Sequence, residues 1–434
     1  MKKKTITILL GLVTLAMTNY GYSQNRAPIV CHVEGELMTN QYGDDIVICE
    51  MGTDLRMHDN PSLHVKAVNG KFSKTIECDH ITKYEAFYFN QYLKGSWQIA
   101  PFLVENGTVK IKLNADPGFN SIVRSGGLEG QKQLTLDSLL NKQFTEESIN
   151  ISSTLYDKDH ESDYFTHEYL ANRDDLLEKL ETARKSDVPA YYIDSIYNAL
   201  NQDNPNKFTP KGLELKNRLN ELSKGYKDFE YNYYVEHPMI GALFKVWDVF
   251  EYYNDDSELV QRYINLYHDK LAKLYPGHPI HEQITQAETA YNLQPGKPYI
   301  DYNVRTNDGK LVPISSLIKG KVALIDLWAS WCGPCRRHSI DMIPVFEKYK
   351  DKGFTVVAIA REDERKNMEK AVKQDRYPWE SLLELNDENQ IWRKNGANNS
   401  GGAMFLIDQD GTILSTSTDV RELERLIEKA LANQ

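Results

Sequence analysis

The stretch at residues 321–344, KVALIDLWASWCGPCRRHSIDMIP, decides the fold of the C-terminal third of this chain. After its lysine it begins with a short apolar run, as in a strand that is buried on both faces. The sequence Cys332-Gly333-Pro334-Cys335 follows, and Pro334 suits the first turn of a helix because no N–H donor is needed there. The stretch therefore predicts a buried strand, a turn that carries two cysteines, and a helix.

The position of the two cysteines predicts their chemistry. Cys332 would lie at the start of the helix, where unpaired N–H groups and the helix dipole stabilise a thiolate. Because a thiolate rather than a thiol attacks a disulfide, Cys332 is the expected nucleophile, and Cys335, one helical turn further on, would resolve the mixed disulfide. Asp326 lies within the apolar strand, six residues before Cys332. A buried acid there would assist proton transfer for Cys335.

The motif LIDLWASWCGPC resembles the active-site strand and loop of the thioredoxin superfamily. Its setting resembles the TlpA/ResA branch of extracytoplasmic thiol–disulfide oxidoreductases, which is grouped with AhpC/TSA-type domains, and the resemblance covers about residues 296–434. It implies a thioredoxin fold, a nucleophilic first cysteine, a resolving second cysteine and a buried acid at Asp326, with Trp331, Gly333 and Pro334 as supporting residues. It also implies protein thiols and disulfides as substrates, a membrane or periplasmic electron donor, and no cofactor.

Two positions depart from the pattern of this family. Its members normally carry a cis-proline that faces the cysteine pair, in a pattern like P-x-x-F-L-I-D, whereas this chain has Gly402 at that position. The proline loop helps to dock the substrate backbone and keeps metal ions off the thiols, so both roles are in question here. ResA-like members often carry a glutamate three residues after the second cysteine. This chain has His338 there, which either exchanges protons near neutral pH or faces solvent.

Length and composition indicate a soluble, exported protein with more than one domain. The chain has 434 residues, too many for one typical core, and 26% of them are charged. Residues 1–23 have the pattern of a secretory signal peptide, with three lysines and then an apolar run at 6–17. Because the signal contains no acids, its removal changes the formal net charge from −11 to −14, which argues against nucleic-acid binding. The predicted location is the periplasm or cell envelope.

Three further cysteines precede the redox motif. Cys31, Cys49 and Cys78 are odd in number, and an oxidising compartment permits disulfides. Either all three are small buried residues of the N-terminal domain, or one bridge joins two of them. The sequence leaves both alternatives open.

The chain divides into three predicted domains after the signal. Residues 24–118 have short β-rich stretches separated by turns such as Asn69-Gly70, which predicts a small antiparallel β domain, a sandwich or barrel. The stretches IVCHVEG, VNGKFS and PFLVENGTVKIKL resemble the domain of unknown function DUF4369, which precedes TlpA-like domains in Bacteroidetes envelope proteins. Residues 119–292 have long helical patterns broken by prolines, and residues 293–434 have the β-α-β-α-β-β-α order that a C-terminal α/β thioredoxin fold requires.

The two regions before the redox domain contain no obvious catalytic constellation. The N-terminal domain has either a binding or dimerising role or a purely structural one. A dimerising role would make the protein a homodimer. The many tyrosines of the helical region either line a groove for extended polypeptide or pack as ordinary amphipathic helices. His278 and His281 have no third ligand in view, which predicts a chance surface pair and no metal site.

The sequence thus predicts an exported thiol–disulfide oxidoreductase, and the C-G-P-C context favours a reductase over an oxidase. One alternative is a metal-binding or redox-inactive binding module, in which Cys332, Cys335 and His338 hold Zn²⁺ or copper because Gly402 replaces the proline. Another is a peroxiredoxin-like peroxidase, although the P-x-x-x-T-x-x-C context of such enzymes is not found before Cys332.

Overall fold

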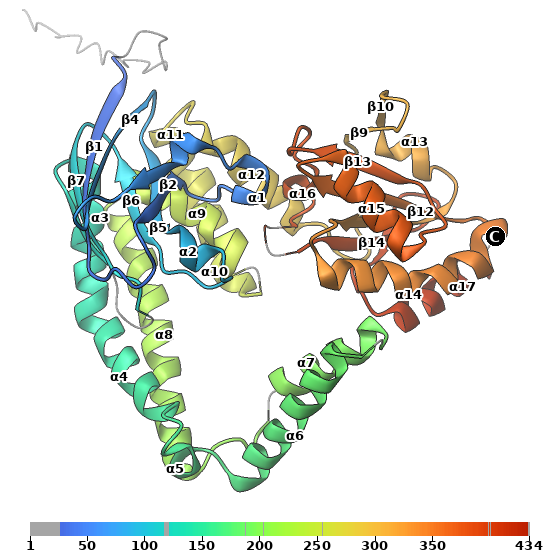
Figure 1. The fold of residues 1–434 in the computed structure, drawn as a ribbon, viewed down its shortest axis with the longest axis horizontal. Coiled ribbons are helices and arrows are strands. Elements are labelled where there is room, and N and C mark those ends of the chain that lie inside the picture. Colours follow the sequence, from blue (N-terminus) through green and yellow to red (C-terminus); the bar gives the residue numbers. More distant parts are fainter. Residues whose placement is uncertain are drawn as a thin grey trace, which may run out of the picture.

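The computed structural model describes residues 27–116, 121–186, 188–202, 204–253, 255–397, 399 and 401–432. Figure 1 shows three parts along the chain: two β-sheets near the N-terminus, a helical middle part, and an α/β part at the C-terminus. The predicted fold class, a multidomain protein with these three kinds of domain, is confirmed. The predicted signal peptide lies outside the described residues and stays a prediction.

The N-terminal part is a sandwich of two four-stranded sheets, with strand orders β4-β1-β7-β8 and β3-β2-β5-β6. All neighbouring strands run antiparallel as predicted, except that β1 and β7 run parallel. Apolar side chains from both sheets fill the space between them, among them Val33, Ile48, Phe72 and Val104. The elements are β1 (Ile29–Leu37), β2 (Asp45–Glu50), α1 (Leu55–His58), η1 (Pro61–Leu63), β3 (His64–Lys66), β4 (Lys71–Cys78), β5 (Thr82–Tyr88), α2 (Phe89–Tyr92), β6 (Ala100–Val104), β7 (Gly107–Leu113) and β8 (Ile122–Ser125).

The three cysteines of this sandwich are free thiols. Cys31 and Cys49 are buried and Cys78 is half-buried. Cys31 belongs to the core between the two sheets, where burial raises the pKa of its thiol. Of the two alternatives that the sequence left open, the structure favours the one in which the cysteines are small buried residues without a bridge.

The middle part is helical, and its core surrounds α9 (Ile240–Tyr252), most of whose residues are buried. The other helices are α3 (Leu128–Leu140), η2 (Asn141–Thr145), α4 (Glu146–Leu155), α5 (Glu161–Tyr164), α6 (His167–Arg184), α7 (Ala190–Asn201), α8 (Pro210–Glu236), α10 (Ser257–Leu266), η3 (Tyr267–Leu271), α11 (Ala272–Leu274) and α12 (Ile280–Tyr291). Among the described residues, no helix combines the length and the apolar character that a membrane span needs.

His278 joins the helical part to the N-terminal sheets. Its Nε2 lies 2.8 Å from the carbonyl oxygen of Ile81, and the side chain is almost fully buried. Burial lowers the pKa of His278 to about 4, so the ring is neutral at physiological pH. The prediction of a surface pair is therefore wrong for this histidine, because the ring contacts a backbone carbonyl from another domain.

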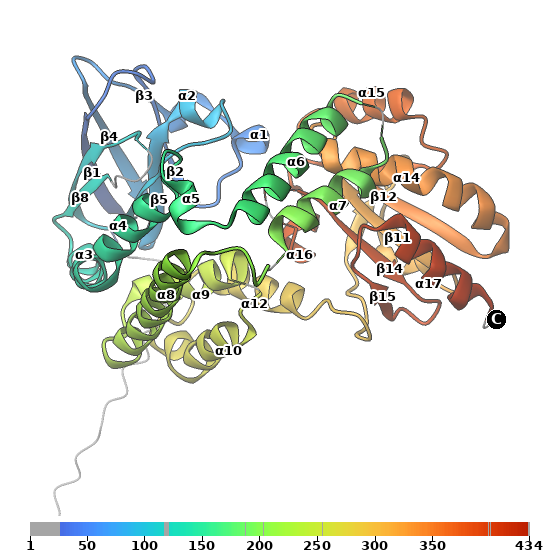
Figure 2. The same cartoon turned by 90° about the horizontal axis from the view of Figure 1, so that it is seen from below.

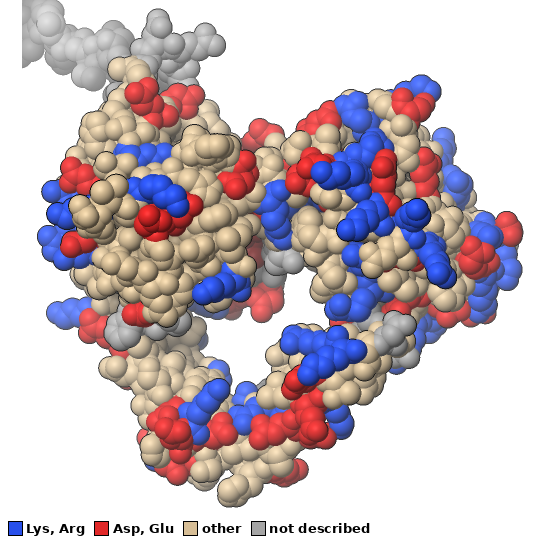
Figure 3. Space-filling view, viewed as in Figure 1, with Lys and Arg blue, Asp and Glu red and all other residues tan. Residues whose placement is uncertain are grey.

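Two helices leave the middle part and reach the C-terminal part. α6 and α7 pack on each other through Leu180, Ala183, Ile193 and Ile196. We call this pair, residues 167–201, the arm. Figure 2 shows α7 beside α14 (Gly333–Tyr349) of the C-terminal part, and the two helices are in contact. The space-filling view in Figure 3 shows an opening between the arm and the two larger bodies of the molecule.

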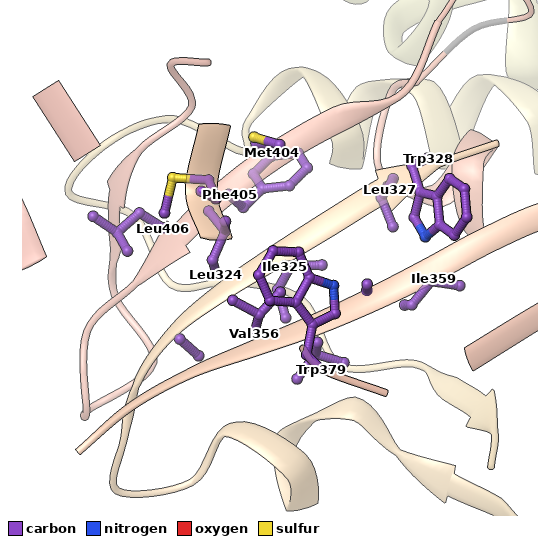
Figure 4. Close-up of a cluster of buried hydrophobic side chains, with 14 of the residues drawn as sticks. Leu324, Ile325, Leu327, Trp328, Val356, Ile359, Trp379, Met404, Phe405 and Leu406 are labelled. Atoms are coloured by element: carbon purple, nitrogen blue, oxygen red, sulfur yellow. The ribbon is translucent and has the colours of Figure 1, made fainter. Parts of the chain in front are cut away.

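The C-terminal part is built on a five-stranded sheet of order β13-β12-β11-β14-β15. β11 is its central strand, parallel to β12 and antiparallel to β14. Figure 4 shows how side chains of these three strands, including Leu324, Ile359 and Phe405, lie together in the core. α14 and α17 contact one another and β11, whereas α15 contacts β12 and β13. The elements are β9 (Asn303–Arg305), β10 (Leu311–Pro313), α13 (Ile314–Ile318), β11 (Val322–Trp328), α14, η4 (Lys350–Lys352), β12 (Phe354–Glu362), α15 (Arg365–Asp375), β13 (Ser381–Leu385), α16 (Ile391–Lys394), β14 (Ala403–Ile407), β15 (Ile413–Ser415) and α17 (Val420–Ala432).

Candidate active site

A disulfide joins Cys332 and Cys335 at the point where β11 has ended and α14 begins. Cys332 caps the helix, and its Sγ accepts a hydrogen bond from the backbone N–H of Cys335, at 3.4 Å. Gly333 is the first helical residue and Pro334 lies in the first turn, where the lack of an N–H costs nothing. Both cysteines are largely buried, with 5% and 7% of their surface exposed. This is the strand–turn–helix arrangement that the sequence predicted.

The helix itself contributes positive charge beside the pair. The N-terminus of α14 directs the N–H of Cys335 and the positive end of the helix dipole at Sγ of Cys332, and both favour a thiolate there. Arg336 lies close by, but its guanidinium donates two hydrogen bonds to the carboxylate of Asp375, at 2.7 and 2.6 Å. Its third contact is with the carbonyl oxygen of Ser330, at 3.3 Å. Since Asp375 offsets its charge, Arg336 acts mainly as a brace for the redox turn.

Asp326 in β11 is almost fully buried and is linked through Ser339 to the backbone of Cys335. Burial in an apolar surrounding raises the pKa of its carboxyl to about 7. Oδ2 of Asp326 is 2.7 Å from Oγ of Ser339, which in turn is 3.0 Å from the carbonyl oxygen of Cys335. A hydroxyl has one proton to donate, so Ser339 bonds to the carboxylate when Asp326 is ionised. When Asp326 is protonated it can donate to Oγ of Ser339, and Ser339 then donates its own proton to the carbonyl oxygen of Cys335.

Gly402 lies against the second sulfur. Its backbone N–H donates a hydrogen bond to Sγ of Cys335, at 3.3 Å. A Cβ at this position would come within 1.7 Å of the carbonyl oxygen of Leu327, so the backbone leaves no room for a side chain. A proline could not make this bond because it has no N–H. At this position the chain therefore presents a donor to the sulfur, where the family pattern has a proline.

His338 contacts the arm. Its Nε2 lies 2.8 Å from Oδ2 of Asp194 on α7, and only 14% of the His338 side chain is exposed. Of the two sequence-based alternatives, the one in which His338 faces solvent is wrong, because a helix from the middle part covers it. The partner is 144 residues away in the chain, which no local pattern indicates.

Three further residues near the pair were not predicted. Ser339 follows Cys335 by one helical turn and faces Asp326. Glu362 is fully buried and accepts a hydrogen bond from Oγ of Ser330, at 2.8 Å, which holds the turn before Cys332. Glu362 lies just after the apolar run at 354–360, and this position in the sequence could have indicated that it is buried. Arg56 of the N-terminal sandwich lies over the ring of Trp331, at 3.7 Å from its centroid, and nothing in the sequence marked it.

The comparisons with known proteins concern this C-terminal part. Residues 295–416 match the model of the AhpC/TSA family. The thiol-disulfide oxidoreductase ResA of a Bacillus cereus strain is 27% identical over 136 residues, which are 31% of this chain and 75% of ResA. The thiol:disulfide interchange protein DsbE of Pseudomonas fluorescens biotype C is 29% identical over 118 residues, 27% of this chain and 63% of DsbE. A solved thioredoxin-family thiol:disulfide interchange protein from Chlorobium tepidum TLS is 26% identical and covers 32% of this chain and 97% of its own, with a TM-score of 0.26.

The C-terminal region thus carries an AhpC/TSA thioredoxin-family domain, as the motif predicted. Its similarity to ResA and DsbE assigns it to the thiol–disulfide oxidoreductases of the thioredoxin fold. The matched residues 295–416 do not include the N-terminal sandwich, so its resemblance to DUF4369 stays a prediction.

Proposed function

We propose that this protein is an exported thiol–disulfide reductase whose redox-active pair is Cys332 and Cys335. The observation that supports this best is the disulfide at the N-terminus of α14, with the buried Asp326 linked through Ser339 to the backbone of Cys335. The helix terminus favours the thiolate of Cys332. The C-G-P-C sequence, which is typical of reducing thioredoxins, supports reduction as the direction of transfer.

In the proposed reaction, the Cys332 thiolate attacks one sulfur of a substrate disulfide. A bond forms between Cys332 and that sulfur, the substrate S–S bond breaks, and the other substrate sulfur leaves as a thiolate that takes up a proton. Cys335 then gives its proton to Asp326 and attacks Sγ of Cys332. The mixed disulfide breaks, the second substrate sulfur leaves as a thiolate that takes up a proton, and two electrons have passed from the cysteine pair to the substrate.

Asp326 and Gly402 assist this second step. A carboxyl whose pKa is about 7 is well matched to accept a proton at neutral pH, because a general base works best when its pKa lies near the working pH. The Gly402 N–H donates to Sγ of Cys335, and a hydrogen bond to sulfur is stronger when the sulfur is charged. Trp331, Gly333 and Pro334 hold the turn, and His338 links it to the arm.

The remaining parts of the proposal concern organisation and partners. We propose a signal peptide at 1–23, a β domain at 24–118, a helical region at 119–292 and the redox domain at 293–434. The substrates are protein disulfides in the periplasm or cell envelope, and a membrane or periplasmic electron donor restores the thiols. The names of ResA and DsbE, an oxidoreductase and an interchange protein, support this substrate class.

The reduction potential of the cysteine pair tests this proposal. The full chain is equilibrated in dithiothreitol or glutathione buffers, and free thiols are counted by alkylation and mass spectrometry. A reductase should have a potential near that of thioredoxin, roughly −270 mV. A value of roughly −120 to −180 mV would instead indicate an oxidase or isomerase. A pair that forms no disulfide would contradict the redox function altogether.

Two cysteine variants give the matched controls. In Cys335→Ser the nucleophile remains and the resolving thiol is lost, so a mixed disulfide with substrate should accumulate. In Cys332→Ser no such adduct should form. Equal amounts of adduct in the two variants would contradict the assignment of Cys332 as nucleophile.

A further inference from the structure

The N-terminal sandwich contacts the redox turn through a short segment around α1. We call residues 52–59 the docking segment. Arg56, in this segment, lies with its guanidinium 3.7 Å from the centroid of the Trp331 ring and donates a hydrogen bond to the carbonyl oxygen of Asn399. Asn399 in turn donates from its side chain to the carbonyl oxygen of Gly52, at 3.2 Å. The docking segment therefore contacts two separate loops of the redox domain.

These two loops frame the cysteine pair. Trp331 directly precedes Cys332 in the chain. Asn399 lies three residues before Gly402, whose N–H contacts Sγ of Cys335. The guanidinium of Arg56 therefore contacts residues that flank both sulfurs in the chain, and only 5% of the surface of Cys332 is exposed.

Buried charges hold Arg56 in this position. Asp54 accepts two hydrogen bonds from the Arg56 side chain, at 2.9 and 2.8 Å. The same carboxylate accepts a hydrogen bond from Nη1 of Arg361 in β12, at 2.8 Å, and both of these side chains are almost fully buried. Arg361 also pairs with Asp387, whose other partner is His58 of the docking segment, at 3.0 Å. Removing one partner from a buried ion pair costs much stability, so the contact between the docking segment and the redox domain is a stable one.

We propose that Arg56 is a specificity-determining residue of the redox site, supplied by the N-terminal domain. Held by Asp54 over the Trp331 ring, it narrows the approach to Cys332. A small or extended disulfide reaches the sulfur, and a disulfide on the rigid surface of a folded protein is excluded. The proposal rests on the proposed disulfide exchange and adds to it the class of substrate that the site accepts.

The test compares two disulfides in the full-length protein. The reduced protein is mixed either with the uncharged disulfide of mercaptoethanol or with native ribonuclease A. Formation of the Cys332–Cys335 disulfide is followed by quenched alkylation and mass spectrometry. Arg56→Ala should raise the rate constant for ribonuclease A by about tenfold or more and leave that for the small disulfide within about twofold, since contacts that shape a site are typically worth such factors.

Two variants serve as controls. Arg124→Ala removes an exposed arginine of β8 in the same domain and should change neither rate. Arg56→Lys keeps the cation and part of the stem but loses the paired hydrogen bonds to Asp54, so its discrimination should lie between those of the wild type and Arg56→Ala. The ratio of the two rates is the quantity that decides, because a general loss of active protein changes both rates alike.

The outcomes separate the two proposals. If the ratio for Arg56→Ala equals that of the wild type, Arg56 does not determine specificity and the inference is wrong, although the redox function stands. If the wild-type protein oxidises with neither disulfide, the proposed function fails, and this inference with it. If circular dichroism shows that Arg56→Ala is unfolded, His58→Ala loosens the same segment through Asp387 and replaces it, with the same ratio as the criterion.

Discussion

The two sides of the Cys332–Cys335 disulfide are built from different parts of the molecule. The inner contacts, from Asp326, Ser339 and Gly402, all come from the redox domain. The outer contacts, from Arg56 and Asp194, come from the N-terminal sandwich and from the arm. Gly402 contacts Sγ of Cys335, and Asp326 and Ser339 are buried and linked to its backbone, whereas the outer residues contact residues that flank the pair.

This difference separates the contacts that affect the reaction of the cysteines from those that affect the approach of a substrate. A buried carboxyl interacts strongly with nearby protons and charges because little water screens it. We therefore expect the inner contacts to control the thiol pKa and the reduction potential. The outer contacts involve partly exposed side chains, and we expect them to control which substrates approach and how the domains are held.

The largest expected effect comes from the inner side. Asp326→Asn removes the proposed proton acceptor for Cys335, and general base catalysis is typically worth about 100-fold or more. The release of substrate from the mixed disulfide should slow by roughly this factor at pH 7. Rapid mixing with a peptide disulfide, followed by acid quench and mass spectrometry, measures this step. The variant Glu369→Gln removes an exposed acid of α15 and should react like the wild type.

The same variant has a second readout in stability. The pKa of Asp326 is about 7 in the folded chain and near 4 in the unfolded chain. Between pH 4 and pH 7 the folded chain therefore holds a proton that the unfolded chain has lost, so the free energy of unfolding falls as the pH rises through this range. Asp326→Asn stays neutral, so it should be more stable than the wild type at pH 8, by up to roughly 4 kcal/mol, and of similar stability near pH 4. Urea unfolding at several pH values checks this. If the free energy of unfolding changed with pH in the same way for both proteins, the raised pKa of Asp326 would be contradicted.

A smaller effect is expected at Gly402. In Gly402→Ala the new Cβ collides with the carbonyl oxygen of Leu327, which should destabilise the protein by about 1–3 kcal/mol, as overpacking does. The backbone shift also weakens the hydrogen bond to Cys335, so the pKa of its thiol should rise. Urea unfolding measures the stability, and alkylation at several pH values in a Cys332→Ser background measures the thiol pKa.

Gly401→Ala is the matched control for that change. A Cβ at Gly401 meets nothing within 4 Å, so stability and thiol pKa should stay as in the wild type. Because Gly402 belongs to the inner contacts, its substitution should leave the preference for a small over a folded disulfide unchanged. A shift in that preference would show that an inner contact also affects the choice of substrate, which would contradict the distinction between inner and outer contacts.

The smallest effect is expected for the arm. Asp194→Asn removes the partner of His338, and because 35% of the Asp194 side chain is exposed, the change should cost at most about 1 kcal/mol. Urea unfolding of the variant and of the wild type measures this cost. A change in the reduction potential of the cysteine pair would show that this outer contact reaches the chemistry after all.

The inner side of the site was largely predictable from the sequence. The apolar run before the cysteines predicted a buried strand, and every residue of β11 is buried. An acid inside that run had to be buried as well, so Asp326 could be singled out. The proline after Cys332 predicted the start of α14. These inferences depend on residues that are neighbours in the chain, where periodicity and turn chemistry act directly.

The outer side could not be predicted in this way. Asp194 and Arg56 carry no local signal, since arginines and aspartates on short helices are mostly solvated surface residues. Gly402 was noted as a missing proline, but its donor role depends on the approach of β14 to Leu327 and Cys335. Strand and helix patterns report which face of an element is buried, not which distant element covers it. The local motif therefore carries the chemistry of this protein, and the packing of domains determines what surrounds that motif.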